Sequence, residues 1–247
     1  MRKRTRKDLL VMLDYDGTLV PIARRPGLAR LSPARKRLLA RLCRAPGACV
    51  AAVTGRSLPD IRKLLSVPGL ILAANHGFEI RAGKKTFHPR GVGCRRNMER
   101  LAEAMSAALG FVPGAIVEPK GFSVAVHYRL SPRGRWGEIE RAVRRISLPY
   151  RRRFGWMVTS GKRLWEVRPA LHWNKGDVAL WLWKRFAPGA AAIYVGDDET
   201  DEDAFRALRG SGLTVAVGRP RSAALCAARD VRDVWRFLRE IVYGATR

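Results

Sequence analysis

Two short clusters of acidic residues, each directly after an apolar run, have the most specific chemistry in this sequence. The first, Asp14-Tyr15-Asp16-Gly17-Thr18, follows Leu9 to Leu13, and the second, Gly196-Asp197-Asp198-Glu199-Thr200-Asp201, follows Ala191 to Val195. Such runs predict buried strands, and carboxylates at the carboxyl ends of parallel strands meet at one edge of an α/β sheet. Carboxylate oxygens are ligands that Mg²⁺ prefers. We therefore expect both clusters to surround one divalent cation.

The spacing within the first cluster suits hydrolysis of a phosphate ester. A carboxylate there can attack phosphorus and form an aspartyl-phosphate, which divides hydrolysis into two easier steps. Asp14 and Asp16 provide two carboxylates, so that while one attacks, the second can give a proton to the leaving oxygen and later take one from water. Because an anionic nucleophile repels a phosphate, a cation is needed, and Asp197 and Asp198 can supply its site. Either cluster alone is compatible with an Asp-Gly turn, but the pair is fairly specific.

Two further positions could complete a phosphate-binding site. Thr54 ends an apolar run and precedes Gly55, so its hydroxyl and the neighbouring backbone N–H groups could bind phosphate oxygens. Lys175 begins a helical pattern and could neutralise the phosphate as a point charge. Taken singly, Thr54 could equally cap a helix and Lys175 could be a surface lysine. Their order around the acidic clusters favours phosphate binding.

The elements that position these residues alternate between strand and helix. Ser32 is expected to cap the first predicted helix, residues 32–44, with Pro33 in its first turn. Alternation of this kind predicts a doubly wound parallel sheet covered on both faces. The predicted strands are 9–15, 48–53, 70–74, 191–195 and 213–217, and the predicted helices are 32–44, 58–65, 175–186, 201–208 and 231–241.

Between these halves the pattern changes to strand pairs that follow helices, which indicates an α+β module. We expect helices at 96–109 and 136–146, strands at 115–118 and 123–129, and hairpins at 78–88 and 156–167. The sequence thus predicts an α/β fold with a Rossmann-like core, residues 1–94 and 171–247, interrupted by an inserted domain at residues 95–170.

The net charge of +27 is extreme, and most of the basic residues are arginines. Such a field attracts anions, including nucleic acids and phosphorylated metabolites. The basic residues are spread over the chain, with runs at 2–7, 95–96 and 151–153, and no nucleic-acid-binding signature accompanies them. We therefore favour solvated arginine-rich faces over specific nucleic-acid binding.

Composition also bears on location. No stretch reaches the length needed to span a membrane, and the N-terminus lacks the apolar segment of a signal peptide. Cys43, Cys49, Cys94 and Cys226 show no metal-ligand spacing and are expected to be free thiols. These features predict a cytoplasmic protein.

The motifs, in this order, resemble those of haloacid-dehalogenase-like phosphatases, and most closely the trehalose-6-phosphate phosphatase family. The resemblance covers nearly the whole chain. The shared segments are Leu13 to Leu19, Val53 to Arg56, Asn75 to Ile80, Glu118 to Lys120, His127 to Arg129, Glu166 to Pro169, Asn174 to Gly176 and Gly196 to Phe205.

The resemblance implies a role for each core residue. Asp14 matches the nucleophile and a metal ligand, and Asp16 matches the general acid and base, whose backbone carbonyl also binds Mg²⁺. Asp197 matches a further metal ligand, with Asp198 and Asp201 in or beside that shell. The phosphate binders implied are Thr54, Gly55 and Lys175.

The same resemblance identifies residues 95–170 as a mobile cap that sets substrate specificity. In it, Glu118, Lys120, Arg129 and Glu166 match positions that contact the sugar, and carboxylates and cations are suitable partners for sugar hydroxyls. The alternative for each is a solvated charge on a strand face. Asn174 stands where Asp is common in the family, and we do not expect this change to abolish activity.

The function implied is Mg²⁺-dependent hydrolysis of trehalose 6-phosphate to trehalose and phosphate. The alternatives are a related phosphatase for sucrose phosphate or mannosyl-phosphoglycerate, or a basic nucleic-acid-binding protein. A synthase that makes the phosphorylated sugar is a possible partner. His76 and His127 are expected to be structural.

Overall fold

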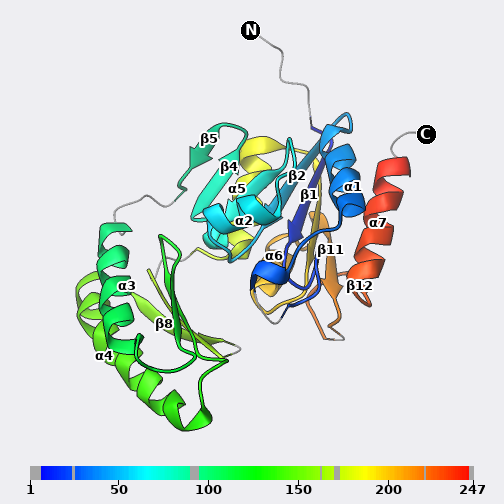
Figure 1. Cartoon of the computed structure of the whole chain (residues 1–247). Coiled ribbons are helices and arrows are strands. Elements are labelled where there is room, and N and C mark those ends of the chain that lie inside the picture. The colour runs from blue at the N-terminus through cyan, green and yellow to red at the C-terminus, as the bar shows by residue number, and fades with distance from the viewer. Residues whose placement is uncertain are drawn as a thin grey trace. The chain divides into compact units, whose positions relative to one another are not determined.

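The structure is a computed structural model that describes residues 7–23, 26–89, 95–161, 163–169, 173–219 and 221–244. It divides into two compact units, residues 1–89 with 173–247 and residues 90–172 (Figure 1). The expected domain boundaries after residues 94 and 170, Cys94, and all but the last residue of the basic run 2–7 lie outside the described residues.

The first unit contains an eight-stranded sheet in the order β12-β11-β10-β1-β2-β3-β4-β5, in which β4 pairs antiparallel with both β3 and β5 and all other pairs are parallel. The strands are β1 (Leu9–Asp14), β2 (Ala48–Val53), β3 (Ile71–Ala74), β4 (Glu79–Ala82), β5 (Lys85–Phe87), β10 (Ala191–Gly196), β11 (Gly212–Val217) and β12 (Cys226–Ala228). The chain extends from β1 towards β3 on one side and from β10 towards β12 on the other. The strand order therefore reverses between β1 and β10, where α/β folds place their sites.

Helices cover both faces of this sheet. The helices are α1 (Pro33–Arg44), α2 (Leu58–Leu64), α5 (Lys175–Phe186), α6 (Asp201–Ala207) and α7 (Val231–Gly244). Side chains of α1, α2 and α7 share one hydrophobic core with Ile193 and Val195 of β10. Tyr194 alternates with these two residues, so it faces the other side, where its ring contacts Phe205 of α6 with 5.9 Å between centroids. The prediction of a doubly wound sheet is confirmed.

The second unit is an antiparallel sheet, in the order β6-β7-β9-β8, packed against two helices. Its elements are α3 (Arg95–Leu109), β6 (Ile116–Pro119), β7 (Val124–His127), α4 (Trp136–Phe154), β8 (Met157–Gly161) and β9 (Leu164–Arg168). Val124, Val126, Trp165 and Val167 alternate along the two central strands and form a core with α3 and α4. The opposite face of this sheet therefore displays the residues between them, including Glu166.

Two elements differ from the sequence-based expectation. Helix α4 continues to Phe154 although Pro149 lies inside it. The ring of Tyr150, directly after the proline, stacks on Trp156 with 5.1 Å between centroids, and this contact favours continuation of the helix. Gly155, with φ 66°, ends it. The short edge strand β12 was not predicted.

No helix in the described part of the chain combines the length and the apolar character needed to cross a membrane.

Candidate active site

The two acidic clusters meet at the carboxyl ends of β1 and β10. These strands are parallel neighbours, with Leu13 opposite Val195, so Asp14 and the loop after Gly196 lie side by side. One carboxylate oxygen from each of Asp14, Asp197 and Asp201 can be chosen so that all three atoms lie within 4.8 Å of one another. The structure thus places residues of both clusters within reach of a common cation.

Asp201 fixes the second cluster through four hydrogen bonds. Its Oδ2 accepts from the backbone N–H groups of Asp197 (3.1 Å) and Asp198 (3.0 Å). Its Oδ1 accepts from Lys175 Nζ (2.7 Å) and the Tyr194 hydroxyl (2.8 Å). Asp201 is fully buried, and both its oxygens are in use. This carboxylate therefore organises the loop that presents Asp197.

Lys175 connects the two clusters. Its Nζ donates to Asp14 Oδ1 at 2.9 Å as well as to Asp201. Its place at the first position of α5 is fixed by a capping box: Asn174 Oδ1 accepts from Asp177 N, and Asp177 Oδ2 accepts from Asn174 N, both at 3.0 Å. Asn and Asp are about equally good N-cap residues, so Asn174 can cap this helix as an aspartate would.

The electrostatics of this group favour an added cation. Burial raises the pKa of Asp14 well above its usual value; Lys175 opposes this shift, while Asp201 and Asp197 reinforce it. Burial alone would lower the pKa of Lys175, but Asp14 and Asp201 hold it above its usual value. One lysine is thus surrounded by more buried carboxylate charge than it balances. A divalent cation with oxygen ligands would restore the balance and favour ionised Asp14.

Thr54 and Gly55 lie in the turn after β2. Because Val53 pairs with Asp14, Thr54 is beside the first acidic cluster. The buried Thr54 hydroxyl accepts a hydrogen bond from Arg56 N at 3.2 Å and retains its own proton for donation. A Cβ on Gly55 would lie 2.8 Å from the His76 ring, so that ring lies close against the backbone of this turn.

The two residues that follow β3 are hydrogen-bonded to this turn and have an uncommon backbone conformation. Asn75 and His76, directly after β3, have φ of 53° and 54°, in the left-handed region that residues other than Gly uncommonly adopt. Their backbone N–H groups donate to Arg56 O (2.7 Å) and Thr54 O (2.9 Å). Such strain is concentrated at functional sites.

Arg56 is the residue that the sequence analysis missed. Its Nε and Nη2 donate to the two oxygens of Asp16 at 2.5 and 2.6 Å, its Nη1 donates to Asp60 at 2.9 Å, and its guanidinium lies 5.4 Å from the centre of the Tyr15 ring. Both oxygens of Asp16 thus accept from Arg56, and Asp16 is not one of the three carboxylates whose oxygens come together. The sequence feature that could have indicated its role is the i, i+4 spacing of Arg56, two residues after Thr54, and Asp60.

The carboxylate of Asp198 is stabilised in its ionised form by its neighbours. Its Oδ1 accepts from Thr200 N at 2.5 Å. Burial would raise its pKa, but Lys175 and this backbone hydrogen bond lower it below the usual value. Asp198 therefore adds negative charge near Lys175, although it is not one of the three carboxylates whose oxygens come together.

Three of the four expected sugar-binding residues are charged groups near one another in the second unit. Glu118 and Glu166 are both opposite Ala125, in one row across β6, β7 and β9. Glu166 Oε1 accepts from Ser123 Oγ at 2.7 Å and lies 3.7 Å from Lys120 Nζ. Arg129 is exposed, just after β7.

His127, which was expected to be structural, lies two residues after Ala125 on β7, on the same face of the sheet as Glu118 and Glu166. Its Nε2 lies 2.7 Å from Glu118 Oε2, and both side chains remain about one-third exposed, at 32% and 35%. The face of the sheet away from the helices thus carries donors and acceptors that a sugar could contact.

Comparisons with known proteins point to one family. The family model for trehalose-phosphatase matches residues 12–224. A trehalose-phosphate phosphatase from Mycobacterium avium is 40% identical over 207 residues, which cover 81% of this chain and 51% of the relative. The chain spans between 18% and 53% of the lengths of the first curated relatives that it matches.

Solved structures agree in fold. The crystal structure of a trehalose-6-phosphate phosphatase related protein superimposes with a TM-score of 0.85 at 25% identity, covering 96% of this chain and 98% of the other. A haloacid dehalogenase-like hydrolase from Bacteroides thetaiotaomicron has a TM-score of 0.66 at 14% identity, covering 96% and 100%. The expected fold class, a haloacid-dehalogenase-like core with an inserted module, is confirmed.

Proposed function

Because the chain belongs to the trehalose-phosphatase family, we propose that it hydrolyses trehalose 6-phosphate to trehalose and phosphate with Mg²⁺ as its cofactor. The observation that supports this most strongly is the buried convergence of Asp14, Lys175 and Asp197 at the ends of two adjacent parallel strands. This arrangement offers a nucleophile, a cation and a ligand set for a phosphate ester.

The residues present fit the expected metal. The carboxylates of Asp14 and Asp197 and the backbone carbonyl of Asp16 would hold it, with Asp198 beside them, and all are the oxygen ligands that Mg²⁺ prefers. When bound, Mg²⁺ neutralises charge on the phosphate oxygens. Asp201 is better suited to positioning than to ligation, since both of its oxygens already accept hydrogen bonds.

In the proposed reaction, the Asp14 carboxylate attacks phosphorus as the bond from phosphorus to the sugar oxygen breaks. Asp16 gives its proton to that leaving oxygen, which releases trehalose. Asp16 then takes a proton from water, the water oxygen attacks the aspartyl-phosphate, and Asp14 is regenerated as phosphate leaves. Lys175, Thr54 and the backbone N–H groups near Gly55 bind the phosphate oxygens. Asp16 must give up part of its contact with Arg56 to take part.

The sugar part is proposed to be bound by Glu118, Lys120, Arg129 and Glu166, in a domain that acts as the cap. The row of Glu118 and Glu166 on one sheet face, with Lys120 3.7 Å from Glu166, supports this. A sugar hydroxyl both donates and accepts, so paired acidic and basic groups can bind it with defined orientation.

Two further proposals concern the surroundings of the enzyme. Cys43, Cys49 and Cys226 are free thiols, as expected, which supports a reducing, cytoplasmic location. A synthase that makes the phosphorylated sugar remains a proposed partner.

The proposal is tested by measuring phosphate release from a panel of sugar phosphates with and without Mg²⁺. We expect trehalose 6-phosphate to be preferred over sucrose 6-phosphate, mannosyl-phosphoglycerate and glucose 6-phosphate. EDTA should abolish release, and Asp14→Asn should lower kcat at least about a thousand-fold, because the nucleophile is lost.

A matched control is Asp8→Asn, which changes an aspartate before β1 and should leave kcat unchanged. An Asp14→Asn variant with undiminished turnover would reject the mechanism. Preference for another sugar phosphate, with the same dependence on Asp14, would keep the mechanism and replace the substrate.

A further inference from the structure

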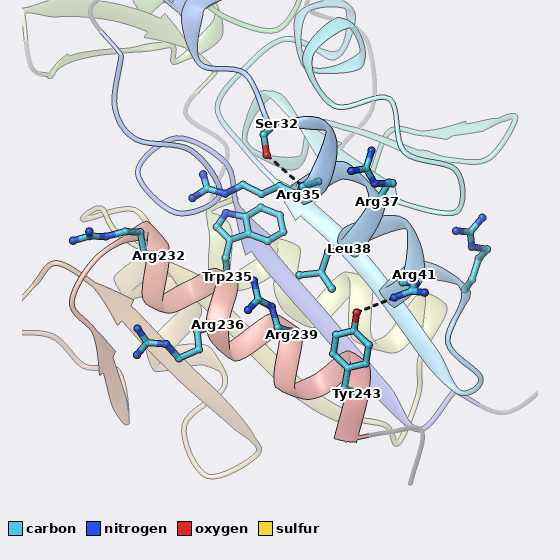
Figure 2. A pocket seen from close by; sticks show the side chains of 12 residues that line it. Ser32, Arg35, Arg37, Leu38, Arg41, Arg232, Trp235, Arg236, Arg239 and Tyr243 are labelled. Atoms are coloured by element: carbon cyan, nitrogen blue, oxygen red, sulfur yellow. Dashed lines mark hydrogen bonds between the residues drawn. The ribbon is translucent and has the colours of Figure 1, made fainter.

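A groove of about 790 Å³ lies between α1 and α7, on the face of the sheet covered by these helices (Figure 2). Seven of the twelve residues that line it are arginines, and none is acidic. None of the residues proposed for catalysis, for metal binding or for sugar binding is among them. The groove is therefore a separate feature of the first unit.

The arginines form two parallel rows. Arg37, Arg41 and Arg44 on α1 have the spacing i, i+4, i+7, which places them along one helix face. Arg232, Arg236 and Arg239 on α7 have the same spacing. Arg35 lies over Trp235 near the start of both helices, and Arg41 over Tyr243 near the end of α7, so the helices run in the same direction. At 1.5 Å per residue, each row of three arginines extends along roughly 10 Å of helix.

Much of this charge has no counter-charge. Helix α1 contains five basic residues and no acidic residue. Within the described residues, no carboxylate makes an ion pair with Arg37, Arg44 or Arg239. On α7, Arg232 pairs with Asp230 at 2.8 Å and Arg236 with Asp233 at 3.2 Å, but both arginines remain largely exposed. Two rows of like charge repel each other, and a bound anion would relieve that repulsion.

The surface of the groove is formed by charged guanidinium groups more than by apolar side chains. Trp235 is only 5% exposed, since Arg35 lies over its ring and its Nε1 donates to Leu19 O at 2.9 Å. Arg41 Nη1 donates to the Tyr243 hydroxyl at 2.8 Å, which fixes the position of that guanidinium. Figure 2 shows guanidinium groups extending from both helices, with Trp235 and Leu38 between them.

We propose that this groove binds the sugar–phosphate backbone of nucleic acid without sequence preference. Guanidinium groups match phosphate oxygens with two parallel hydrogen bonds, and phosphate contacts alone can supply non-specific affinity. A protein partner would bury a core depleted of charge, and this groove offers the opposite. A membrane surface is contacted by residues that project from a protein, whereas a concave groove can enclose a ridge of linked phosphates.

The test is fluorescence anisotropy of a labelled 20-bp duplex of random sequence, with the full chain, between about 50 and 200 mM NaCl. The groove variant is Arg37→Gln/Arg44→Gln/Arg239→Gln, three exposed positions where Gln keeps helix propensity. The control is Arg151→Gln/Arg152→Gln/Arg153→Gln in α4, which removes the same charge from exposed positions of the second unit.

We expect the groove variant to weaken binding at 50 mM NaCl by about tenfold or more. The slope of log K against log salt should become shallower by about 2.7, since each phosphate contact contributes about 0.9. The α4 control should bind within about threefold of the unchanged chain, and phosphate release should be the same in all three proteins.

Equal weakening by both triple variants would overturn the proposal, because overall charge would then explain the binding. So would absence of binding at 50 mM NaCl. Poly-L-glutamate of matched charge is added as a competitor. If it displaces the duplex more effectively than unlabelled duplex does, the groove is a site for an acidic protein instead.

Discussion

At the scale of single residues, the site depends on a carboxylate that is neither the proposed nucleophile nor a proposed ligand. Asp201 accepts from two backbone N–H groups and two side chains, and it is fully buried. Each oxygen has two donors facing it. The loop that carries Asp197 and the ammonium group of Lys175 are thus fixed by the same side chain.

We predict that Asp201→Asn lowers the free energy of unfolding by about 3 kcal/mol, the range for breaking a buried ion pair. An amide has one acceptor oxygen, so either orientation turns an NH₂ group towards two donors. Urea unfolding followed by tryptophan fluorescence measures the change. The control is Asp203→Asn, a partly exposed aspartate in the same helix, which should cost no more than about 0.5 kcal/mol. Equal costs for the two variants would contradict this role for Asp201.

The sequence could predict some of these residues and not others. The meeting of Asp14 with Asp197 is confirmed, because it follows from two strand ends and the known geometry of parallel sheets. The contacts of Asp201 could not be derived from local pattern, because Tyr194 is one of several apolar residues in β10. The pairing of Arg56 with Asp16 joins residues 40 positions apart, and no periodicity reports it.

At the scale of elements, strands were easier to predict than the ends of helices. Runs of β-branched and aliphatic residues buried on both faces identify parallel strands by composition alone. The length of α4 was harder, because Pro149 argues for an earlier end and only the aromatic contacts beyond it extend the helix. β12 has three residues and pairs on one side only, so its sequence contains little signal.

Close packing of α5 against the turn after β3 gives a prediction at this scale. Gly77 has φ 80°, and a Cβ there would lie 2.2 Å from Val178 Cγ2 in α5, whereas Gly83 has φ 59° and open space around it. Gly83→Ala should cost about 1 kcal/mol, the conformational cost alone. Gly77→Ala should cost at least about 2 kcal/mol more, because the methyl group collides with α5.

Urea unfolding of the two variants measures this difference. A double variant, Gly77→Ala with Val178→Ala, should be less destabilised than the sum of the single changes, because the second removes the colliding methyl groups. Additive effects would show that backbone conformation, not contact with α5, accounts for the cost.

At the scale of the whole molecule, charge is the dominant property. The chain has a net charge of +27, and each of its two units has its own hydrophobic core. Exposed ion pairs such as Arg135–Glu138 and Arg144–Glu140 are worth little individually. Repulsion among the remaining cations opposes the compact state of each unit.

These two electrostatic effects respond to salt with opposite signs. Salt weakens attraction in exposed ion pairs, which would lower stability, and weakens repulsion between like charges, which would raise it. With such an excess of cations, we predict that the apparent midpoint of thermal unfolding rises by several degrees, on the order of 1 kcal/mol, between about 20 and 500 mM NaCl. Circular dichroism at 222 nm, the wavelength at which helix signal is followed, measures the midpoint. The variant Arg151→Gln/Arg152→Gln/Arg153→Gln removes three cations from one helix and should unfold at a higher temperature in low salt, with a smaller rise. A midpoint that falls as salt is added would mean that paired charges, and not the net excess, govern the stability of this protein.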